Sequence, residues 1–323
     1  DFTDARKVAA NINIPYYVFD FEDSFREKVI DNFINTYQVG KTPNPCIDCN
    51  TKVKFRELRD RSESLGTKLV ATGHFARIKK DDQGYHLLRG KDLDKDQSYF
   101  LYGMSQDDLA NTVFPVGEMT KAEVREIAAK SGLQVAAKPE SQDICFISGT
   151  VGDFIAKHSQ RDTSGLIIDR DNKVLGSHQG IENFTVGQRR GLGVGGSSEP
   201  LYVVEIDPNK FNVIVGYRSE LTLNTFNVEQ LSWLSPALIK KSHDTSDFKF
   251  QAIAQLRHRH KGVLVNVKVS NRVAICEYAD KFSIASPGQA CVFYDLENTE
   301  VLGGGRIFKE NKKPQAESLN IVN

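Results

Sequence analysis

Three of the five cysteines lie in polar surroundings, rich in turn-forming residues, where a thiol could react. Cys46 and Cys49 form a C-x-x-C pair directly after a Pro-Asn-Pro segment, and Cys145 follows far along the chain. The proline rings restrict the backbone just before the pair. Cys276 and Cys291 stand instead in apolar, strand-like runs, where cysteine usually packs as a small hydrophobic residue. The first three thiols therefore indicate sulfur chemistry.

The residues after the pair predict that Cys49 is a nucleophile. Residues 50–58 are predicted to begin a helix, with Asn50 as its N-cap. A thiol at a helix N-terminus, beside Lys52 and Lys54, is expected to have a lowered pKa, because the helix dipole and the two cations favour the thiolate.

Other functions of a C-x-x-C motif stay open on the residues alone. A structural zinc site needs a second pair of ligands at similar spacing, and the sequence has no second C-x-x-C and no H-x-x-x-H. A thioredoxin-like motif would follow a strand directly, without Pro-Asn-Pro before it. A loop cysteine without function is the simplest alternative, and the polar surroundings of Cys49 and Cys145 argue against it.

An ordered series of segments resembles the bacterial tRNA-specific 2-thiouridylases over nearly the whole chain. A single short motif would be weak evidence, but the series in this order is specific. The segments lie at residues 40–50 (GKTPNPC to CN), 54–55 (KF), 71–77 (ATGHFAR), 95–101 (KDQSYFL), 114–118 (FPVGE), 141–146 (SQDICF), 185–193 (TVGQRRGLG) and 287–289 (PGQ).

The resemblance and the pattern of elements predict the fold class. We expect an α/β, parallel-sheet ATP-pyrophosphatase (PP-loop) domain that is incomplete at its N-terminus, a small linking domain, and a C-terminal antiparallel β-barrel. The predicted bounds are 1–150 for the partial nucleotide-binding and catalytic domain, 151–222 for the linking domain, 223–310 for the barrel and 311–323 for a tail.

Local patterns predict individual elements. Helices are expected over residues 4–11, 24–37, 121–130 and 152–158, the third of them opened by a capping box at Thr120. Strands are expected over 16–20 and 68–72, a hairpin over 76–90, strand pairs over 165–176, and a glycine turn at 303–305.

The family's Ser-Gly-Gly-x-Asp-Ser loop, which would cradle the pyrophosphate of ATP, has no counterpart in residues 1–323. The similar string at 195–198 lacks the Asp and the following apolar helix, and we interpret it as a turn. We expect a chain that begins inside the nucleotide-binding domain. Because the phosphates would lose these backbone contacts, we expect residues 1–323 to be inactive or severely impaired in ATP-dependent thiolation.

The resemblance implies a sulfurtransferase that 2-thiolates the wobble uridine of tRNA. ATP, with Mg²⁺, would adenylate the C2 oxygen of the uracil. A persulfide on Cys145, loaded by a sulfur-donor protein such as a cysteine desulfurase or a sulfur-relay protein, would deliver sulfur to C2, with AMP and pyrophosphate as products. Cys49 would attack the Cys145 sulfur and leave a Cys49–Cys145 disulfide that must be reduced. No metal site besides ATP-associated Mg²⁺ is implied.

The resemblance also implies binding residues. Gly73, at the predicted carboxyl end of a strand, would let the backbone approach ATP. Asn44, Pro45 and Cys46 would hold the flipped target base. The family often has Asp where this chain has Cys46, so the general base is unassigned, and Asp48 is expected to point elsewhere. Three roles stay open for Cys46: a bystander, a competing thiol, or part of the base pocket with Asn44 and Pro45. The residues implied to contact tRNA are His74, Lys95, Asp96, Gln97, Arg257, His258 and Gln289.

Composition narrows the class of protein. The 42 Lys and Arg residues balance 42 Asp and Glu residues, so RNA binding would need local patches such as 257–261. No apolar run approaches the roughly 20 residues that span a bilayer, so no membrane partner is expected. An odd number of cysteines without framework spacing suits a reducing compartment, and we expect the cytoplasm.

Two other functions stay open. A related PP-loop, AMP-forming ligase would activate a carboxylate and would need no pair of distant cysteines. An RNA-binding fragment without catalysis would tolerate serine at both Cys49 and Cys145.

Overall fold

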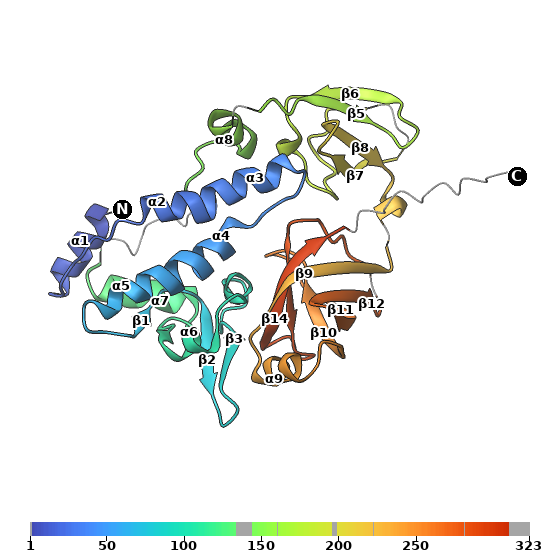
Figure 1. The fold of residues 1–323 in the computed structure, drawn as a ribbon. Helices are drawn as coiled ribbons and strands as arrows, with labels where there is room; N and C mark the ends of the chain where they lie inside the picture. The colour runs from blue at the N-terminus through green and yellow to red at the C-terminus, as the bar shows by residue number, and fades with distance from the viewer. Residues whose placement is uncertain are drawn as a thin grey trace, which may run out of the picture.

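The computed structural model describes residues 2–133, 144–159, 161–195, 199–221, 223–280 and 282–309. Three folded parts follow one another along the chain (Figure 1): a mainly helical part, a small four-stranded sheet, and a closed barrel. The antiparallel barrel and the small sheet before it were both predicted. Residues 134–143 and 310–323, which include the start of the SQDICF segment and the predicted tail, lie outside the described residues, as do residues 196–198 of the predicted glycine turn.

Two long helices form the main body of the first part. They lie side by side (Figure 1), where Lys28 pairs with Glu57 and Asn32 Nδ2 donates to Asp48 Oδ2 over 3.1 Å. The first of these two helices confirms the helix predicted over residues 24–37. The first helix consists of α2 (Glu22–Phe25), the π-helical η1 (Arg26–Asp31) and α3 (Asn32–Gln38), and the second of α4 (Pro45–Asp48), the π-helical η2 (Cys49–Glu57) and α5 (Leu58–Glu63).

The sheet of the first part is smaller than predicted. Helix α1 (Phe2–Asn11) confirms the helix expected over 4–11, but residues 16–20 are not a strand. No described strand pairs with them, and Tyr17 and Val18 are each 59% exposed, so their β-branched and aromatic pattern has no sheet to join. Strand β1 (Val70–Ala71) is a shorter form of the expected strand and pairs in parallel with β4 (Thr112–Val113).

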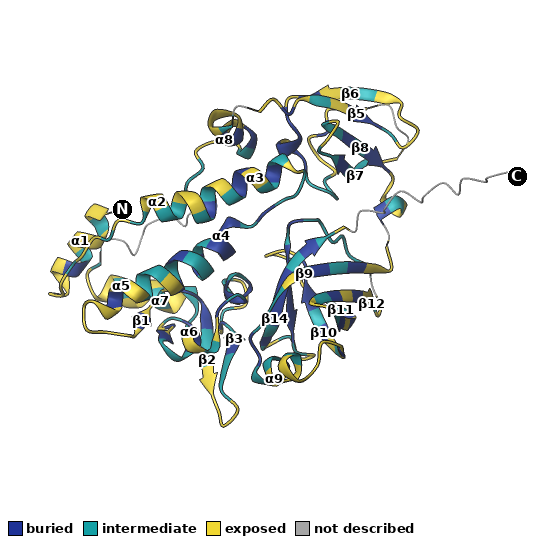
Figure 2. Ribbon diagram, viewed as in Figure 1, coloured by how far each residue is buried: buried dark blue, intermediate teal, exposed yellow. Residues whose placement is uncertain are grey.

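The rest of the first part follows the predictions. Strands β2 (Ala76–Lys80) and β3 (Tyr85–Arg89) form the expected hairpin, and the predicted capping box at Thr120 is present at the start of α7 (Lys121–Lys130). The 3-10 helix η3 (Ser98–Leu101) and helix α6 (Gln106–Ala110) lie between them in the sequence. Tyr99, Leu101 and Tyr102 are buried against the barrel in one shared core. Figure 2 shows that the barrel strand β14 is also largely buried.

The second part is a small sheet beside one helix. Helix α8 (Val151–His158) buries Phe154 against Phe33 of the first long helix, which links the two parts. The strand order is β6-β5-β8-β7, with β5 and β8 parallel. The elements are β5 (Gly165–Ile168), β6 (Val174–His178), η5 (Ile181–Asn183), β7 (Tyr202–Asp207), β8 (Asn212–Gly216) and η6 (Arg218–Leu221).

The third part is a closed six-stranded barrel with strand order β10-β11-β12-β9-β14-β13. The predicted turn at residues 303–305 is wrong, because these glycines lie inside β14. A Cβ on Gly304 would lie 2.9 Å from Cδ2 of Tyr102, so the bare backbone lets the first part pack against the barrel. The elements are β9 (Thr225–Trp233), α9 (Pro236–Asp244), β10 (Phe248–Gln255), β11 (Val263–Ser270), β12 (Val273–Tyr278), β13 (Ala290–Tyr294) and β14 (Val301–Phe308).

Candidate functional site: three thiols where the folded parts meet

The segment that leads into the C-x-x-C pair belongs to the first part and contacts both of the others. The Thr42 backbone N–H donates to the Pro287 carbonyl over 2.9 Å, and Gln289 Nε2 donates to the Thr42 carbonyl over 3.0 Å. On its other side, Thr42 Oγ1 lies 2.9 Å from Oγ1 of Thr185, in the second part. The sheet part and the barrel thus fix the chain just before the thiols.

The helix that bears the pair begins earlier than predicted. Asn44 has extended geometry at the N-cap and Pro45 occupies the first helical turn, where its fixed φ and missing N–H are tolerated. The predicted N-cap, Asn50, lies inside the helix, where its buried Nδ2 donates to the Phe100 carbonyl over 3.2 Å. Cys46 is exposed and Cys49 is half-buried, and both belong to the first turns of one helix.

The predicted lowering of the Cys49 pKa is wrong. Burial raises the pKa of Cys49, Lys54 opposes this rise, and the charges of Cys145 and Asp48 add to it. The pKa of Cys46 is raised as well, first by burial and then by the charges of Cys145 and Cys49. Both thiols are therefore largely protonated at neutral pH, because the neighbouring thiols and the loss of water outweigh the cation.

Cys145 is remote in sequence but lies within electrostatic reach of the pair. Its neighbour Phe146 packs on the first long helix, with ring centroids 5.7 Å from Phe25 and 5.4 Å from Phe33. Cys145 itself is exposed, and its charge acts on both Cys46 and Cys49. The structure thus brings the three sequence-predicted thiols into one cluster, in which all of them are free.

A buried ion pair that sequence reasoning missed anchors the thiol-bearing helix to the barrel. Asp48 is engaged away from the target-base residues, as expected: its Oδ2 accepts from Arg306 Nη2 over 2.9 Å, and its Oδ1 lies 3.0 Å from Lys52 Nζ. Arg306 comes from β14, 258 positions later, and its Nη1 is buried without a partner among the described residues. No local motif could have indicated this pairing.

His74 and Gly73 follow β1 in the first part. The His74 ring is buried between Phe55 and Phe114, with centroids 6.0 and 5.9 Å away, and its Nδ1 lies 2.7 Å from Thr72 Oγ1. Burial, with a smaller effect from Lys54, lowers its pKa to about 4, so it is neutral at pH 7. The structure gives this ring a packing role, and its predicted contact with tRNA stays a prediction.

Gly73 stays a candidate for ATP. It is exposed, and a Cβ placed on it would meet no atom within 4 Å. The described residues therefore leave room beside the backbone for a nucleotide at this point, which is the fit that the prediction requires.

The KDQ segment shapes its own loop. Asp96 is buried, and its carboxylate accepts from the Gly90 N–H over 3.0 Å and from Arg89 Nη1 over 2.6 Å. Gln97 accepts from the Phe75 N–H over 2.9 Å through Oε1, while its own N–H donates to the Phe75 carbonyl over 2.9 Å. Lys95 is half-buried. These contacts fix the loop, and the RNA contacts predicted for the segment stay predictions.

The predicted basic patch is exposed beside the same loop. Arg257 and His258 are both exposed, and the His258 ring lies 4.4 Å from that of Phe100. Gln255 Nε2 holds this turn in place by donating to the His258 carbonyl over 2.6 Å. The patch therefore lies near the helix residue Asn50, which also contacts Phe100.

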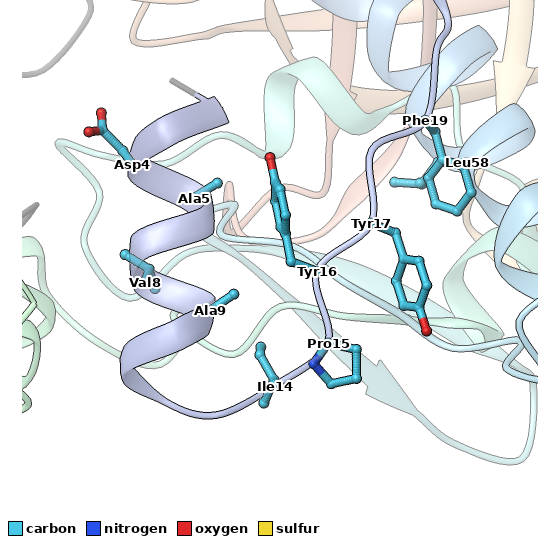
Figure 3. A pocket seen from close by; sticks show the side chains of 10 residues that line it. All are labelled: Asp4, Ala5, Val8, Ala9, Ile14, Pro15, Tyr16, Tyr17, Phe19 and Leu58. Atoms are coloured by element: carbon cyan, nitrogen blue, oxygen red, sulfur yellow. The ribbon is translucent and has the colours of Figure 1, made fainter.

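An apolar groove of about 690 Å³, whose lining includes none of the three thiols, lies near the N-terminus of the first part (Figure 3). Helix α1 and the extended segment after it form its walls, with Leu58 contributed by α5. Leu58 follows Cys49 by nine residues and lies directly after the end of η2. The lining residues are Asp4, Ala5, Val8, Ala9, Ile14, Pro15, Tyr16, Tyr17, Phe19 and Leu58.

The described residues lack both a metal-binding cluster and a membrane-spanning helix. They contain no group of three or more His, Cys, Asp or Glu side chains arranged to hold a metal ion. Among the same residues, no helix is both long enough and apolar enough to cross a membrane.

Three family models match consecutive parts of the chain. They are described as a tRNA methyl transferase HUP domain (residues 1–149), a tRNA methyl transferase PRC-barrel domain (152–217) and an aminomethyltransferase beta-barrel domain (223–307). Their order confirms the predicted fold class, including the α/β nature of the first part, where the described sheet is short.

Curated relatives match over nearly the whole chain. A protein of Parvibaculum lavamentivorans is 42% identical over 96% of this chain and 78% of its own length, and one of Leptospira interrogans is 41% identical over 96% and 81%. A protein of Rickettsia typhi is 43% identical over 95% and 84%. Each of the three is named tRNA-specific 2-thiouridylase MnmA.

Proposed function

This chain belongs to the tRNA-specific 2-thiouridylase family, and we propose that it catalyses the ATP-dependent 2-thiolation of the wobble uridine of tRNA in the cytoplasm. The products would be the thiolated tRNA, AMP and pyrophosphate. The sulfur would come from a protein that carries a persulfide, such as a cysteine desulfurase or a sulfur-relay protein.

The observation that carries this proposal is the cluster of Cys46, Cys49 and Cys145 at the junction of the folded parts. Delivering sulfur from a persulfide needs one thiol to hold it and a second within reach to displace it. The two candidates are remote in sequence, and packing of Phe146 on the first long helix supports their proximity. A ligase that activates a carboxylate would have no use for this arrangement.

ATP, when bound, supplies the activation of the C2 oxygen, which is otherwise a poor leaving group. The open space beside Gly73 supports a nucleotide at the carboxyl end of β1. No Mg²⁺ ligands are assigned, since the ion would be held mainly by the phosphates.

The chain's own residues would perform the sulfur step. The outer sulfur of the Cys145 persulfide bonds to C2 as the activated oxygen departs. Cys49 then attacks the Cys145 Sγ, breaks the sulfur–sulfur bond, and leaves the transferred sulfur on the base with its electron pair. The two thiols lose two electrons together and end as a Cys49–Cys145 disulfide. Because the pKa of Cys49 is raised, the attack should become faster as pH rises toward 9.

The target base would lie at the start of the thiol-bearing helix, beside Asn44, Pro45 and Cys46. The exposed Arg257 and His258 support a phosphate-binding surface on the barrel. The remaining residues proposed to contact tRNA are His74, Lys95, Asp96, Gln97 and Gln289, several of which also hold the loops in place.

The test is ATP-dependent formation of 2-thiouridine on tRNA, supplied with a persulfide donor and read by mass spectrometry of the nucleosides. It is run on residues 1–323 and on the same chain joined to the N-terminal segment of a curated relative. In the active form, Cys49→Ser and Cys145→Ser should each lower the rate by about 10³-fold or more, while tRNA affinity is kept. Cys276→Ala, in the barrel core, is the matched control.

Two results would point to the alternative functions. If both serine variants thiolate at the wild-type rate, the thiols are not the sulfur carriers, and an RNA-binding role without catalysis is favoured. If AMP is formed only with a carboxylate substrate, the chain is an AMP-forming ligase.

A further inference from the structure

We propose that Cys46 is a resolving thiol, which attacks Cys49 in the Cys49–Cys145 disulfide and frees Cys145 for the next persulfide. The inference rests on the proposed function, since that disulfide is the end state of sulfur transfer.

The geometry of the helix permits the bond. Cys46 and Cys49 lie three positions apart at the start of one continuous helix that begins at Pro45. Helical rise and radius place their Cα atoms about 5 Å apart, inside the range of about 4.4–6.8 Å that a disulfide tolerates. The two side chains lie on the same face of the helix, as three-residue spacing requires. A Cys46–Cys49 disulfide therefore needs only local adjustment.

The exchange frees Cys145, which the next round of sulfur transfer requires. Cys145 lies outside the thiol-bearing helix, next to Phe146, which packs on Phe25 and Phe33. Its thiol must be free before it can accept sulfur from a donor protein. Cys46 is exposed while Cys49 is half-buried. Moving the disulfide onto the C-x-x-C pair therefore frees the exposed Cys145 for a donor protein, and the exposed Cys46 leaves the new disulfide open to an external dithiol.

The step balances without another reactant. The Cys46 thiolate bonds to Cys49 Sγ, the Cys49–Cys145 bond breaks, and Cys145 leaves as a thiolate that takes up a proton. One disulfide replaces another, so no electrons enter at this point. A dithiol reductant then attacks Cys46, and after a second exchange both helix thiols are reduced while the reductant becomes a disulfide.

The charges around the cluster support the exchange. The pKa of Cys46 is raised by the charges of Cys145 and Cys49 after burial itself. Once those two sulfurs are joined in a disulfide they have no charge, so this part of the rise disappears. Lys54 still favours the thiolate of Cys46. The attacking thiol is therefore easier to ionise in the state that needs resolving.

The experiment maps the disulfide after one turnover without reductant. The active form is mixed with persulfide donor, ATP and tRNA, quenched in acid, alkylated and digested with trypsin. Peptide 42–52 contains both Cys46 and Cys49, and peptide 131–157 contains Cys145. The wild type should yield peptide 42–52 with an internal disulfide. Cys46→Ser should yield peptide 42–52 cross-linked to 131–157.

A kinetic comparison separates a resolving role from a structural one. With a dithiol present, Cys46→Ser should lower the steady-state rate by about tenfold or more relative to its own first-turnover rate. Raising the dithiol concentration should restore the steady-state rate, because the reductant then attacks the disulfide directly. Cys276→Ala should keep the wild-type ratio of the two rates.

Two outcomes would overturn the inference and leave the proposed function intact: a wild type that thiolates tRNA but accumulates the cross-linked peptides, or an unchanged rate ratio in Cys46→Ser. If the active form with all its native cysteines forms no 2-thiouridine, the proposed function is contradicted instead. In that case the exchange is tested in a glutathione redox buffer without tRNA, where a prevailing Cys46–Cys49 disulfide supports the relay and a prevailing Cys49–Cys145 disulfide overturns it.

Discussion

Two groups of cysteines in this molecule have opposite surroundings. Cys46, Cys49 and Cys145 lie exposed or half-buried where three folded parts meet. Cys276 and Cys291 are fully buried on β12 and β13 inside the barrel, where burial and Cys276 raise the pKa of Cys291 well above its usual value. The first group can be reached by a partner and the second cannot. Accessibility at a junction, more than residue type or pKa, distinguishes the reactive thiols.

The barrel strands and the long helices also place their cysteines in different ways. The barrel closes its hydrogen-bond ladder on itself and leaves its cysteines as packing residues. The helices bring residues from distant parts of the chain to one point and leave the thiols at the rim. The barrel still contributes to the site through Gln289, in the loop before β13, and through Arg306, on β14.

The largest expected effect is a difference in alkylation rate. With excess iodoacetamide at pH 8, Cys46, Cys49 and Cys145 should react from the native state. Cys276 and Cys291 should react at least about 10³-fold more slowly, because they require an unfolding transition of about 5 kcal/mol or more. Peptide mapping by mass spectrometry over time measures all five sites. Equal rates in the two groups would remove the distinction.

The second prediction breaks the link between the barrel and the thiol-bearing helix. Arg306→Met removes the barrel's cation from the buried Asp48 carboxylate, which keeps the Asn32 amide and the partly exposed Lys52, and should cost about 3 kcal/mol or more of unfolding free energy. The matched control is Lys309→Met, which removes an exposed ion pair with Glu205 and should cost less than about 1 kcal/mol. Denaturant unfolding measures both, and similar losses in the two variants would contradict an anchoring role.

The sequence predicted features that depend on neighbouring residues better than features that depend on residues far along the chain. The capping box at Thr120 and the hairpin before it depend on neighbouring residues, and both were predicted correctly. The helix start was displaced to Pro45, because a proline at the first turn outweighed the N-cap preference of Asn50. Residues 16–20 have a strand pattern, but a strand forms only with a partner.

The electrostatics of the site were the least predictable part. The sequence shows the cations that favour a Cys49 thiolate, but not the burial and neighbouring charges that oppose them. The pairing of Asp48 with Arg306 spans 258 positions and follows from tertiary packing alone. Resemblance to the family supplied Cys145 as a partner of Cys49, which spacing could not have done.

The third prediction concerns His74, which is buried where the cluster thiols are not. The unfolded chain binds a proton on this histidine near pH 6.5 but the folded chain only near pH 4, so stability should fall as pH drops through that window. Relative to His74→Asn, whose amide can replace Nδ1 opposite Thr72, the wild type should lose about 3 kcal/mol between pH 7 and pH 4. Unfolding at several pH values measures the difference, and parallel curves would contradict it.

The smallest expected effect tests which cation acts on the helix thiols. Lys54 lowers the pKa of Cys49, whereas Lys52 is paired with Asp48. In a background with Cys46 and Cys145 replaced by serine, Lys54→Met should therefore raise the Cys49 pKa, and slow its alkylation at pH 7.5 by about threefold. Lys52→Met, the matched control, should change the rate less. If Lys52→Met slows the alkylation of Cys49 more than Lys54→Met does, Lys52, nearer the start of the helix, is the cation that favours the thiolate. The difference in reactivity between the junction thiols and the barrel thiols would then rest on exposure alone.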